Sequence, residues 1–157
     1  MGLGYVGGAV QEWFTREKSS VDLFLYDKFK GIGSVEEVNN AEIVFVAVPT
    51  PFRENGGGYD DRAVQEAVRS VADGKIVVVK STVLPGTTEA LQRKYPHKPI
   101  IFNPEFLRAR TSVRDFLEPD RQIVGYTALS RPVAERTLEI LPPAPFIRVL
   151  PATEAEM

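Results

Sequence analysis

Three glycines at the start of the chain, Gly2, Gly4 and Gly7, have the spacing G-x-G-x-x-G. In this pattern the first glycine permits a tight turn, the second lets the backbone approach a pyrophosphate, and the third brings a helix close to a strand. A helix that begins here would direct the amides of Tyr5 and Val6, and its positive dipole end, toward phosphates. The spacing alone is weak support for a binding site, because glycine-rich turns without a ligand are common.

A carboxylate further along the chain strengthens this interpretation. Asp27 ends the apolar run of residues 21–26, twenty residues after Gly7. At that position a carboxylate accepts hydrogen bonds from the hydroxyls of an adenosine ribose. The same negative charge disfavours the 2′-phosphate of NADP, so the two features together predict NAD as the cofactor.

Hydroxyl side chains follow two further apolar runs. Thr50 follows the run in "VAVPT", and Ser81 and Thr82 follow the run in "VVVKST". In an open α/β sheet the carboxyl ends of the strands face one crevice, so we expect these hydroxyls beside the glycine turn. Ser and Thr also cap helices and shape turns, and the residue types leave both interpretations open.

Glu105 comes after another apolar run and an Asn-Pro turn, where its carboxylate could orient a water or a substrate hydroxyl. The alternative is a solvated acid paired with Arg108 or Arg110, and the residues alone favour that alternative. The sequence contains no cluster of metal-ligand residues, so we predict no metal site.

The elements that must position these residues alternate between strand and helix. Apolar residues at helical spacing predict helices at residues 8–18, 62–72, 87–95, 112–117 and 131–141, with a brief helical or turn segment at 34–39. Short apolar runs predict strands at residues 21–26, 41–48, 75–82, 99–102, 122–126 and 146–150. The polar, glycine-rich residues 53–61 are expected to form a loop. The alternation predicts one α/β domain, Rossmann-like and doubly wound, with a mainly parallel sheet.

The glycine turn should follow a strand, yet only Met1 precedes Gly2. In the usual strand order, 3-2-1-4-5-6, that first strand is central. We therefore expect a sheet that lacks its own first strand, at a cost of about 1–3 kcal/mol for each buried backbone group left unpaired. Our hypothesis is an N-terminally truncated domain over residues 1–151, followed by the start of an interdomain helix at 152–157. Direct pairing of the neighbouring strands, self-association or strand exchange could close the gap.

Composition narrows the class of protein. A formal net charge of −2 disfavours binding to nucleic acid. The absence of cysteine excludes disulfides, thiolate metal sites and a cysteine nucleophile within these residues. No apolar run reaches the roughly 18 residues of a membrane span, so we expect no membrane partner and a cytoplasmic location.

Four segments, taken in order, resemble a known family: GLGYVG, VAVPTPF, KSTVLPGT and NPEFLR…DFLEPDRQIVG. They are similar to the N-terminal NAD-binding domain of the UDP-glucose/GDP-mannose dehydrogenase family, and the resemblance covers residues 2–157. Members of that family oxidise the C6 alcohol of a nucleotide sugar to the carboxylate with NAD. The resemblance implies that NAD is held by Gly2, Gly4, Gly7 and Asp27, with Thr50 and Thr82 near its ribose and nicotinamide.

The resemblance also implies catalytic roles. Thr82 and Glu105 would position the catalytic water, and the main chain at Phe106 and Leu107 would border the sugar. Two departures from the family's pattern put these catalytic roles in question. Ala109 replaces an acidic residue of the family, and the family's catalytic cysteine belongs to a part that these residues do not include. We therefore predict NAD binding without turnover by this chain alone, with the nucleotide sugar bound only together with a C-terminal part. The alternative is a degenerate, non-catalytic nucleotide-binding or interaction module.

Overall fold

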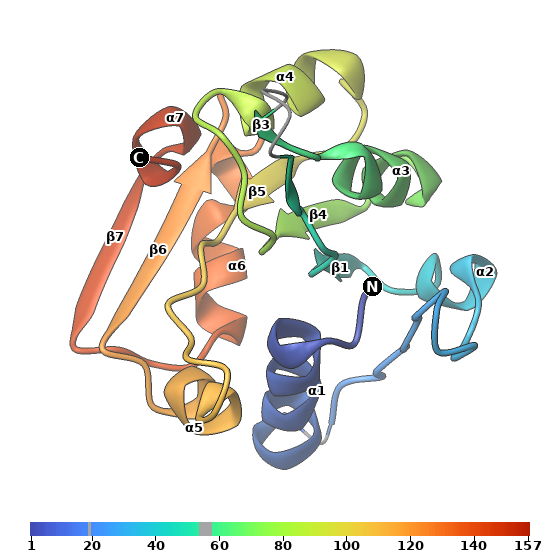
Figure 1. Ribbon diagram of the computed structural model, residues 1–157. Helices are drawn as coiled ribbons and strands as arrows, with labels where there is room; N and C mark the ends of the chain where they lie inside the picture. Colours follow the sequence, from blue (N-terminus) through green and yellow to red (C-terminus); the bar gives the residue numbers. More distant parts are fainter. Residues whose placement is uncertain (19, 54–57) are drawn as a thin grey trace.

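The computed structural model contains a five-stranded sheet with helices on both faces (Figure 1). It describes residues 1–18, 20–53 and 58–157. The sheet has the order β1-β4-β5-β6-β7, formed by β1 (Ile43–Val46), β4 (Ile76–Val79), β5 (Ile100–Phe102), β6 (Arg121–Tyr126) and β7 (Phe146–Pro151). Neighbouring strands are parallel except for β5 and β6, which are antiparallel. The predicted α/β fold with a mainly parallel sheet is confirmed.

The helices form two layers, one on each face of the sheet. One layer contains α1 (Tyr5–Glu17), α5 (Ser112–Leu117) and α6 (Ala134–Ile140), the last preceded by a 3-10 turn (Arg131–Val133). The other layer contains α2 (Val35–Val38), α3 (Arg62–Ser70), α4 (Thr87–Lys94) and α7 (Ala152–Ala155). No helix among the described residues has the length and apolar character needed to cross a membrane.

Strand β4 shows why the apolar runs in this sequence are unbroken. Its four residues are all buried. Side chains alternate between the faces of a strand, so Ile76 and Val78 pack with α1 while Val77 and Val79 pack with α3 and α4. A strand covered on both faces needs apolar residues at every position.

The strand predicted at residues 21–26 is not formed, and that prediction is wrong. Gly2 N–H donates to Tyr26 O at 2.9 Å, and Asp27 forms an isolated bridge with Ile32, but among the described residues no hydrogen bond joins residues 22–26 to β1. Met1 bonds to Phe45 and Ala47, so the strand position before Gly2 lies between residues 22–26 and β1, whereas the usual order 3-2-1-4-5-6 would place residues 75–82 beside it. These two neighbouring segments, residues 22–26 and β1, do not pair directly. A strand requires a ladder partner for its backbone groups, and Met1 and Gly2 supply that partner only at one end.

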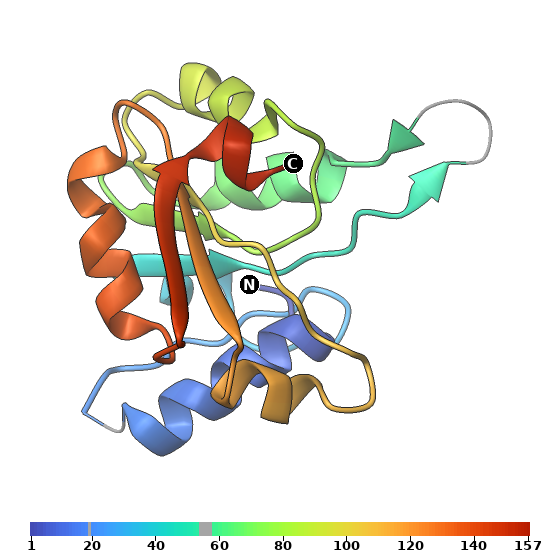
Figure 2. The same cartoon turned by 90° about the vertical axis from the view of Figure 1, so that its left-hand side faces the viewer.

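The loop expected at residues 53–61 contains a short strand pair. The antiparallel strands β2 (Phe52–Arg53) and β3 (Gly58–Tyr59) extend from the body of the domain (Figure 2). The rings of Phe52 and Tyr59 lie 5.6 Å apart between centroids. Contact between these two rings stabilises a strand pair that the glycine content alone did not predict. Residues 54–57 of the expected loop lie outside the described residues.

Candidate functional site

The glycine turn connects Met1, beside β1, to the first turn of α1. Gly2 has φ of +81°, and a Cβ atom built on it would lie 2.3 Å from Ala47 O. A Cβ atom on Gly7 would lie 1.7 Å from Gly2 O. The packing of the chain against itself therefore requires glycine at both positions.

Gly4 is different, because the chain's own packing does not require a glycine there. It precedes the 13-residue helix α1 as its N-cap, has extended backbone with φ of −73°, and a Cβ atom built on it would meet nothing within 4 Å. Among the described residues, the amides of Gly4, Tyr5 and Val6 have no hydrogen-bond partner. Free amides at the positive end of a helix are suited to an anion.

The carboxylate of Asp27 holds this turn in place. Its Oδ2 accepts a 2.8 Å hydrogen bond from the Leu3 amide, and its Oδ1 accepts 3.0 Å bonds from the amides of Phe29 and Lys30. The Leu3 hydrogen bond, with smaller contributions from those two amides and the Lys30 charge, lowers the pKa of this nearly buried carboxyl. A carboxylate has about four acceptor positions, so Oδ2 retains capacity for a ligand hydroxyl.

A cavity of about 540 Å³ brings most of the predicted site residues together. Its lining includes Gly2, Gly4, Tyr5, Val6, Asp27, Thr50, Ser81, Thr82 and Glu105. Gly7 does not line this cavity; it lies behind the turn, along a separate groove. The carboxyl ends of β1 and β4 thus face the glycine turn, as the strand order requires.

The three hydroxyl side chains differ in their surroundings. Ser81 is buried, and its hydroxyl donates to Val48 O at 2.8 Å and accepts from Val48 N–H at 2.9 Å. Ser81 therefore ties the end of β4 to the end of β1, which matches the turn-shaping alternative. Thr82 is exposed and Thr50 is half-buried, and among the described residues neither hydroxyl has a hydrogen-bond partner.

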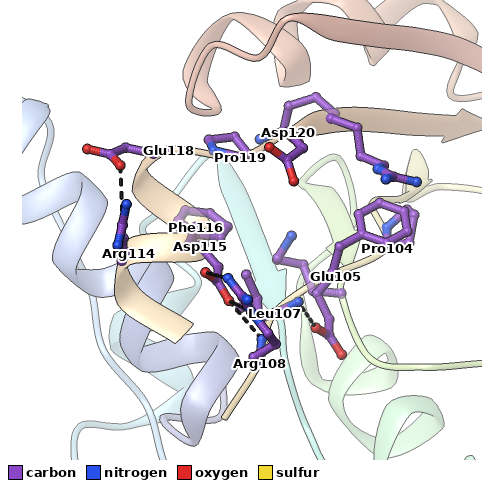
Figure 3. A pocket seen from close by; sticks show the side chains of 14 residues that line it. Pro104, Glu105, Leu107, Arg108, Arg114, Asp115, Phe116, Glu118, Pro119 and Asp120 are labelled. Atoms are coloured by element: carbon purple, nitrogen blue, oxygen red, sulfur yellow. Dashed lines mark hydrogen bonds and ion pairs between the residues drawn. The ribbon is translucent and has the colours of Figure 1, made fainter. Parts of the chain in front are cut away.

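Glu105 lies between this cavity and a second one of about 540 Å³, which Figure 3 shows. Its Oε2 accepts a 2.9 Å hydrogen bond from the Leu107 amide. Arg108 instead pairs with Asp115 at 2.8 Å, so the solvated ion pair considered for Glu105 and Arg108 is not formed. Phe106 and Leu107 line the second cavity.

Lys80 was not predicted from the sequence as a site residue. Its fully buried side chain lines both cavities. Its Nζ donates to Asn103 Oδ1 at 2.6 Å and lies 5.1 Å from the centre of the Phe116 ring. Burial lowers the pKa of Lys80 to about 7, against the opposing effect of the Glu105 charge. The sequence did contain one sign of this site, because Lys80 directly follows the unbroken apolar run of β4.

Comparisons with known proteins agree with this geometry. Residues 25–140 match the model of the UDP-glucose/GDP-mannose dehydrogenase family, NAD binding domain. A UDP-glucose 6-dehydrogenase of Campylobacter jejuni is 35% identical over 89 residues, which is 55% of this chain and 23% of that protein. UDP-glucose 6-dehydrogenase 2 of Arabidopsis thaliana is 38% identical over 104 residues, which is 57% of this chain and 22% of that protein. The match to these curated relatives thus spans less than a quarter of their length.

Solved structures support the same family and fold. A UDP-glucose dehydrogenase from Pyrobaculum islandicum superposes with a TM-score of 0.67 at 35% identity, over 78% of this chain and 31% of that one. A GDP-mannose dehydrogenase from Pseudomonas aeruginosa shares the fold, with a TM-score of 0.73 at 20% identity over 99% of this chain and 46% of that one. The chain belongs to the UDP-glucose/GDP-mannose dehydrogenase family and corresponds to its NAD-binding domain.

Proposed function

We propose that NAD binds in the cavity beside the glycine turn, with its pyrophosphate on the amides at the start of α1 and its adenosine ribose on Asp27. The observation that carries this proposal is Gly4, where glycine leaves open a space that a Cβ atom would fill. Free amides face the same region, and a carboxylate with remaining acceptor capacity lines the same cavity. These groups fit a dinucleotide in charge and hydrogen bonding.

The nicotinamide end of NAD would lie toward Thr50 and Thr82, where the bound cofactor supplies a hydride acceptor. Thr82 and Glu105 would orient a water or a substrate hydroxyl beside it. Glu105 supports this role because it lines both cavities and among the described residues has no ion-pair partner. The second cavity would then take part of the substrate, with the main chain at Phe106 and Leu107 along the sugar.

For the whole protein, we propose the activity of a nucleotide-sugar 6-dehydrogenase, which oxidises a C6 alcohol to a carboxylate with NAD. Residues 1–151 would form the cofactor domain, and residues 152–157 would begin the connection to the part that completes the substrate site. The Glu156 carboxylate supports a fixed start for that connection, because it accepts hydrogen bonds from the amides of Gly86 and Thr88 at 2.6 and 2.8 Å.

A second candidate function is a non-catalytic nucleotide-binding module. One feature favours it, which is Ala109 in place of an acidic residue of the family. Both candidates bind NAD, and they differ in whether the complete polypeptide carries out chemistry on a nucleotide sugar. For this chain alone we propose binding without turnover, so formation of NADH from UDP-glucose by these residues would contradict the proposal.

Calorimetric titration with NAD tests the cofactor site through a pair of matched variants. Gly4→Ala places a methyl group where the pyrophosphate would approach, so we expect affinity at least tenfold weaker. Gly8→Ala is the control, because a Cβ atom there also meets nothing within 4 Å, yet Gly8 does not line the cavity. Equal affinity of the two variants for NAD would place the pyrophosphate elsewhere and refute the proposed site.

A further inference from the structure

Three cavities meet at the carboxyl ends of β4 and β5, and among the described residues only Lys80 and Glu105 line all three. Two of them are the cavity assigned to NAD and the second cavity in Figure 3. The third, of about 300 Å³, extends from these two residues to α7. The amine of Lys80 therefore lies at the wall that the cofactor cavity shares with the proposed substrate cavity.

The side chain of Lys80 is held in one position. Lys80 directly follows β4, and its backbone amide donates to Val46 O at 2.8 Å. Because side chains alternate between the faces of a strand, Lys80 lies on the face of Val78, where α5 packs and the Phe116 ring lies below Nζ. The residue is 2% exposed, so its amine is a fixed feature of the junction.

Asn103 presents two oxygen atoms to this amine. Nζ of Lys80 donates to Asn103 Oδ1 at 2.6 Å and to Asn103 O at 3.3 Å. The amide group of Asn103 is fixed in this orientation, because its Nδ2 donates to Ile123 O at 2.7 Å and to Gln122 Oε1 at 3.3 Å. The polar partners of Nζ are thus two uncharged acceptors.

The number of these acceptors fits a neutral amine. An ammonium group has three N–H donors, whereas a neutral amine has two and a lone pair. Within the described residues, the two oxygens of Asn103 are the only acceptors for Nζ, and no carboxylate forms an ion pair with it. Burial of an unpaired charge is costly, and burial lowers the pKa of Lys80 to about 7. A neutral Lys80 has a lone pair that can accept a proton.

Most charged side chains on the elements around Lys80 pair with other groups. Ion pairs join Arg108 to Asp115 at 2.8 Å and Arg114 to Glu118 at 3.6 Å. The remaining charged groups on β6, on the segment before it and around α7 are Asp120, Arg121, Glu154 and Glu156. Glu105 is the charge that opposes the effect of burial on the pKa of Lys80.

We propose that the amine of Lys80 accepts the proton of the substrate hydroxyl during oxidation of the alcohol, which makes Lys80 a catalytic residue. This inference rests on the proposed function, which places a substrate hydroxyl between NAD and Glu105. The O–H proton moves to Nζ, the hydride leaves the same carbon for the cofactor, and a C=O bond forms. The products are an aldehyde, the reduced cofactor and an ammonium group, so atoms and charge balance.

The surroundings of Lys80 also accommodate the ammonium group that this step creates. The ring centre of Phe116 lies 5.1 Å from Nζ, and a cation over an aromatic ring is attracted to it. The Glu105 charge acts in the same direction. The nicotinamide ring is positively charged before reduction and neutral after it, so one positive charge is present at the junction before and after the step.

Calorimetric titration with NAD and with NADH, at pH 6 and at pH 8, tests this proposal without turnover. A protonated Lys80 repels the positive nicotinamide of NAD and not the neutral ring of NADH. We expect the ratio of the NAD affinity to the NADH affinity to rise about fivefold from pH 6 to pH 8. The Met1 amine lines the same cavity, but both cofactors carry the same phosphates, so its titration cancels in the ratio.

Two buried lysines provide matched variants. Lys80→Met should remove the pH dependence of the affinity ratio, while Lys98→Met should leave it unchanged. Lys98 is 5% exposed, its Nζ donates to Val68 O and Arg69 O at 3.1 and 3.2 Å, and it lines none of the three cavities. A pH dependence that persists in Lys80→Met and disappears in Glu105→Gln would make Glu105 the proton acceptor and overturn the proposal.

NMR titration of the lysine side chains tests the same claim in the unaltered chain. The pKa of Lys80 should be lower with NAD bound than with NADH bound, and the Nζ signal of Lys98 should be the same with either cofactor. Binding of both cofactors with one common pKa for Lys80 would refute this role and leave the NAD site standing. Failure of both cofactors to bind would refute the proposed function itself, and this inference with it.

Discussion

Single residues of the site divide into those that hold the fold and those whose polar groups face the cavity. Ser81 and Asp27 use their side chains to join segments distant in sequence. Thr82 has an exposed hydroxyl, and only one oxygen of Glu105 accepts a hydrogen bond from the described residues. Residue type alone could not separate Ser81 from Thr82, because neighbouring residues after a strand point in different directions.

Ser81 and Thr82 should therefore respond differently to substitution. Ser81→Ala removes both hydrogen bonds to Val48 and should lower the free energy of unfolding by about 1–3 kcal/mol, with little change in NAD affinity. Thr82→Val should leave stability nearly unchanged and weaken NAD binding several-fold. Urea unfolding and NAD titration of both variants check this, and a stability loss confined to Thr82→Val would contradict the assignment.

At the scale of elements, the sequence predicted most strands and helices, because continuous apolar runs are typical of strands that are covered on both faces. Strand β4 and helix α3 lie within a few residues of their predicted bounds. The failure at residues 21–26 has a physical cause: strand propensity was present, but the backbone partner was not. The paired β2 and β3 depend on cross-strand contact that local composition does not encode.

The junction of Met1 with β1 should make stability depend on pH. Burial lowers the pKa of the Met1 ammonium from 8.0 to about 6, against the opposing effect of Asp27. Between these values the unfolded chain binds more protons than the folded one, so stability rises with pH from about 6 to 8 and is lost as pH falls through that range. A difference of two pKa units amounts to about 3 kcal/mol.

Urea unfolding between pH 5.5 and 8.5 measures this dependence. Acetylation of the Met1 amine is the control, because it removes the titrating group and leaves an N–H that can still donate to Phe45 O. We expect the acetylated chain to lose most of the rise in stability between about pH 6 and 8. A rise that acetylation leaves intact would assign the effect to another group.

At the scale of the whole molecule, the candidate site residues lie at one edge of the sheet. The carboxyl ends of β1, β4 and β5 carry Thr50, Thr82 and Glu105 toward the glycine turn, and the helices on both faces fix those strands. The general location of the site followed from the sequence because the strand order of an open α/β sheet determines where its carboxyl ends meet. The role of Gly4 followed from the glycine spacing, whereas the burial of Lys80 between the two cavities depends on three-dimensional packing and was not predicted.

The central claim is that NAD lies on the amides at the start of α1, and amide NMR spectra during a titration with NAD test it most directly. We predict saturable shifts that are largest at Gly4, Tyr5 and Val6, with a further shift at Leu3, whose amide bonds to Asp27. Saturable binding with the largest shifts among Arg108, Asp115 and Arg121 of the second cavity, and none at the glycine turn, would contradict the account.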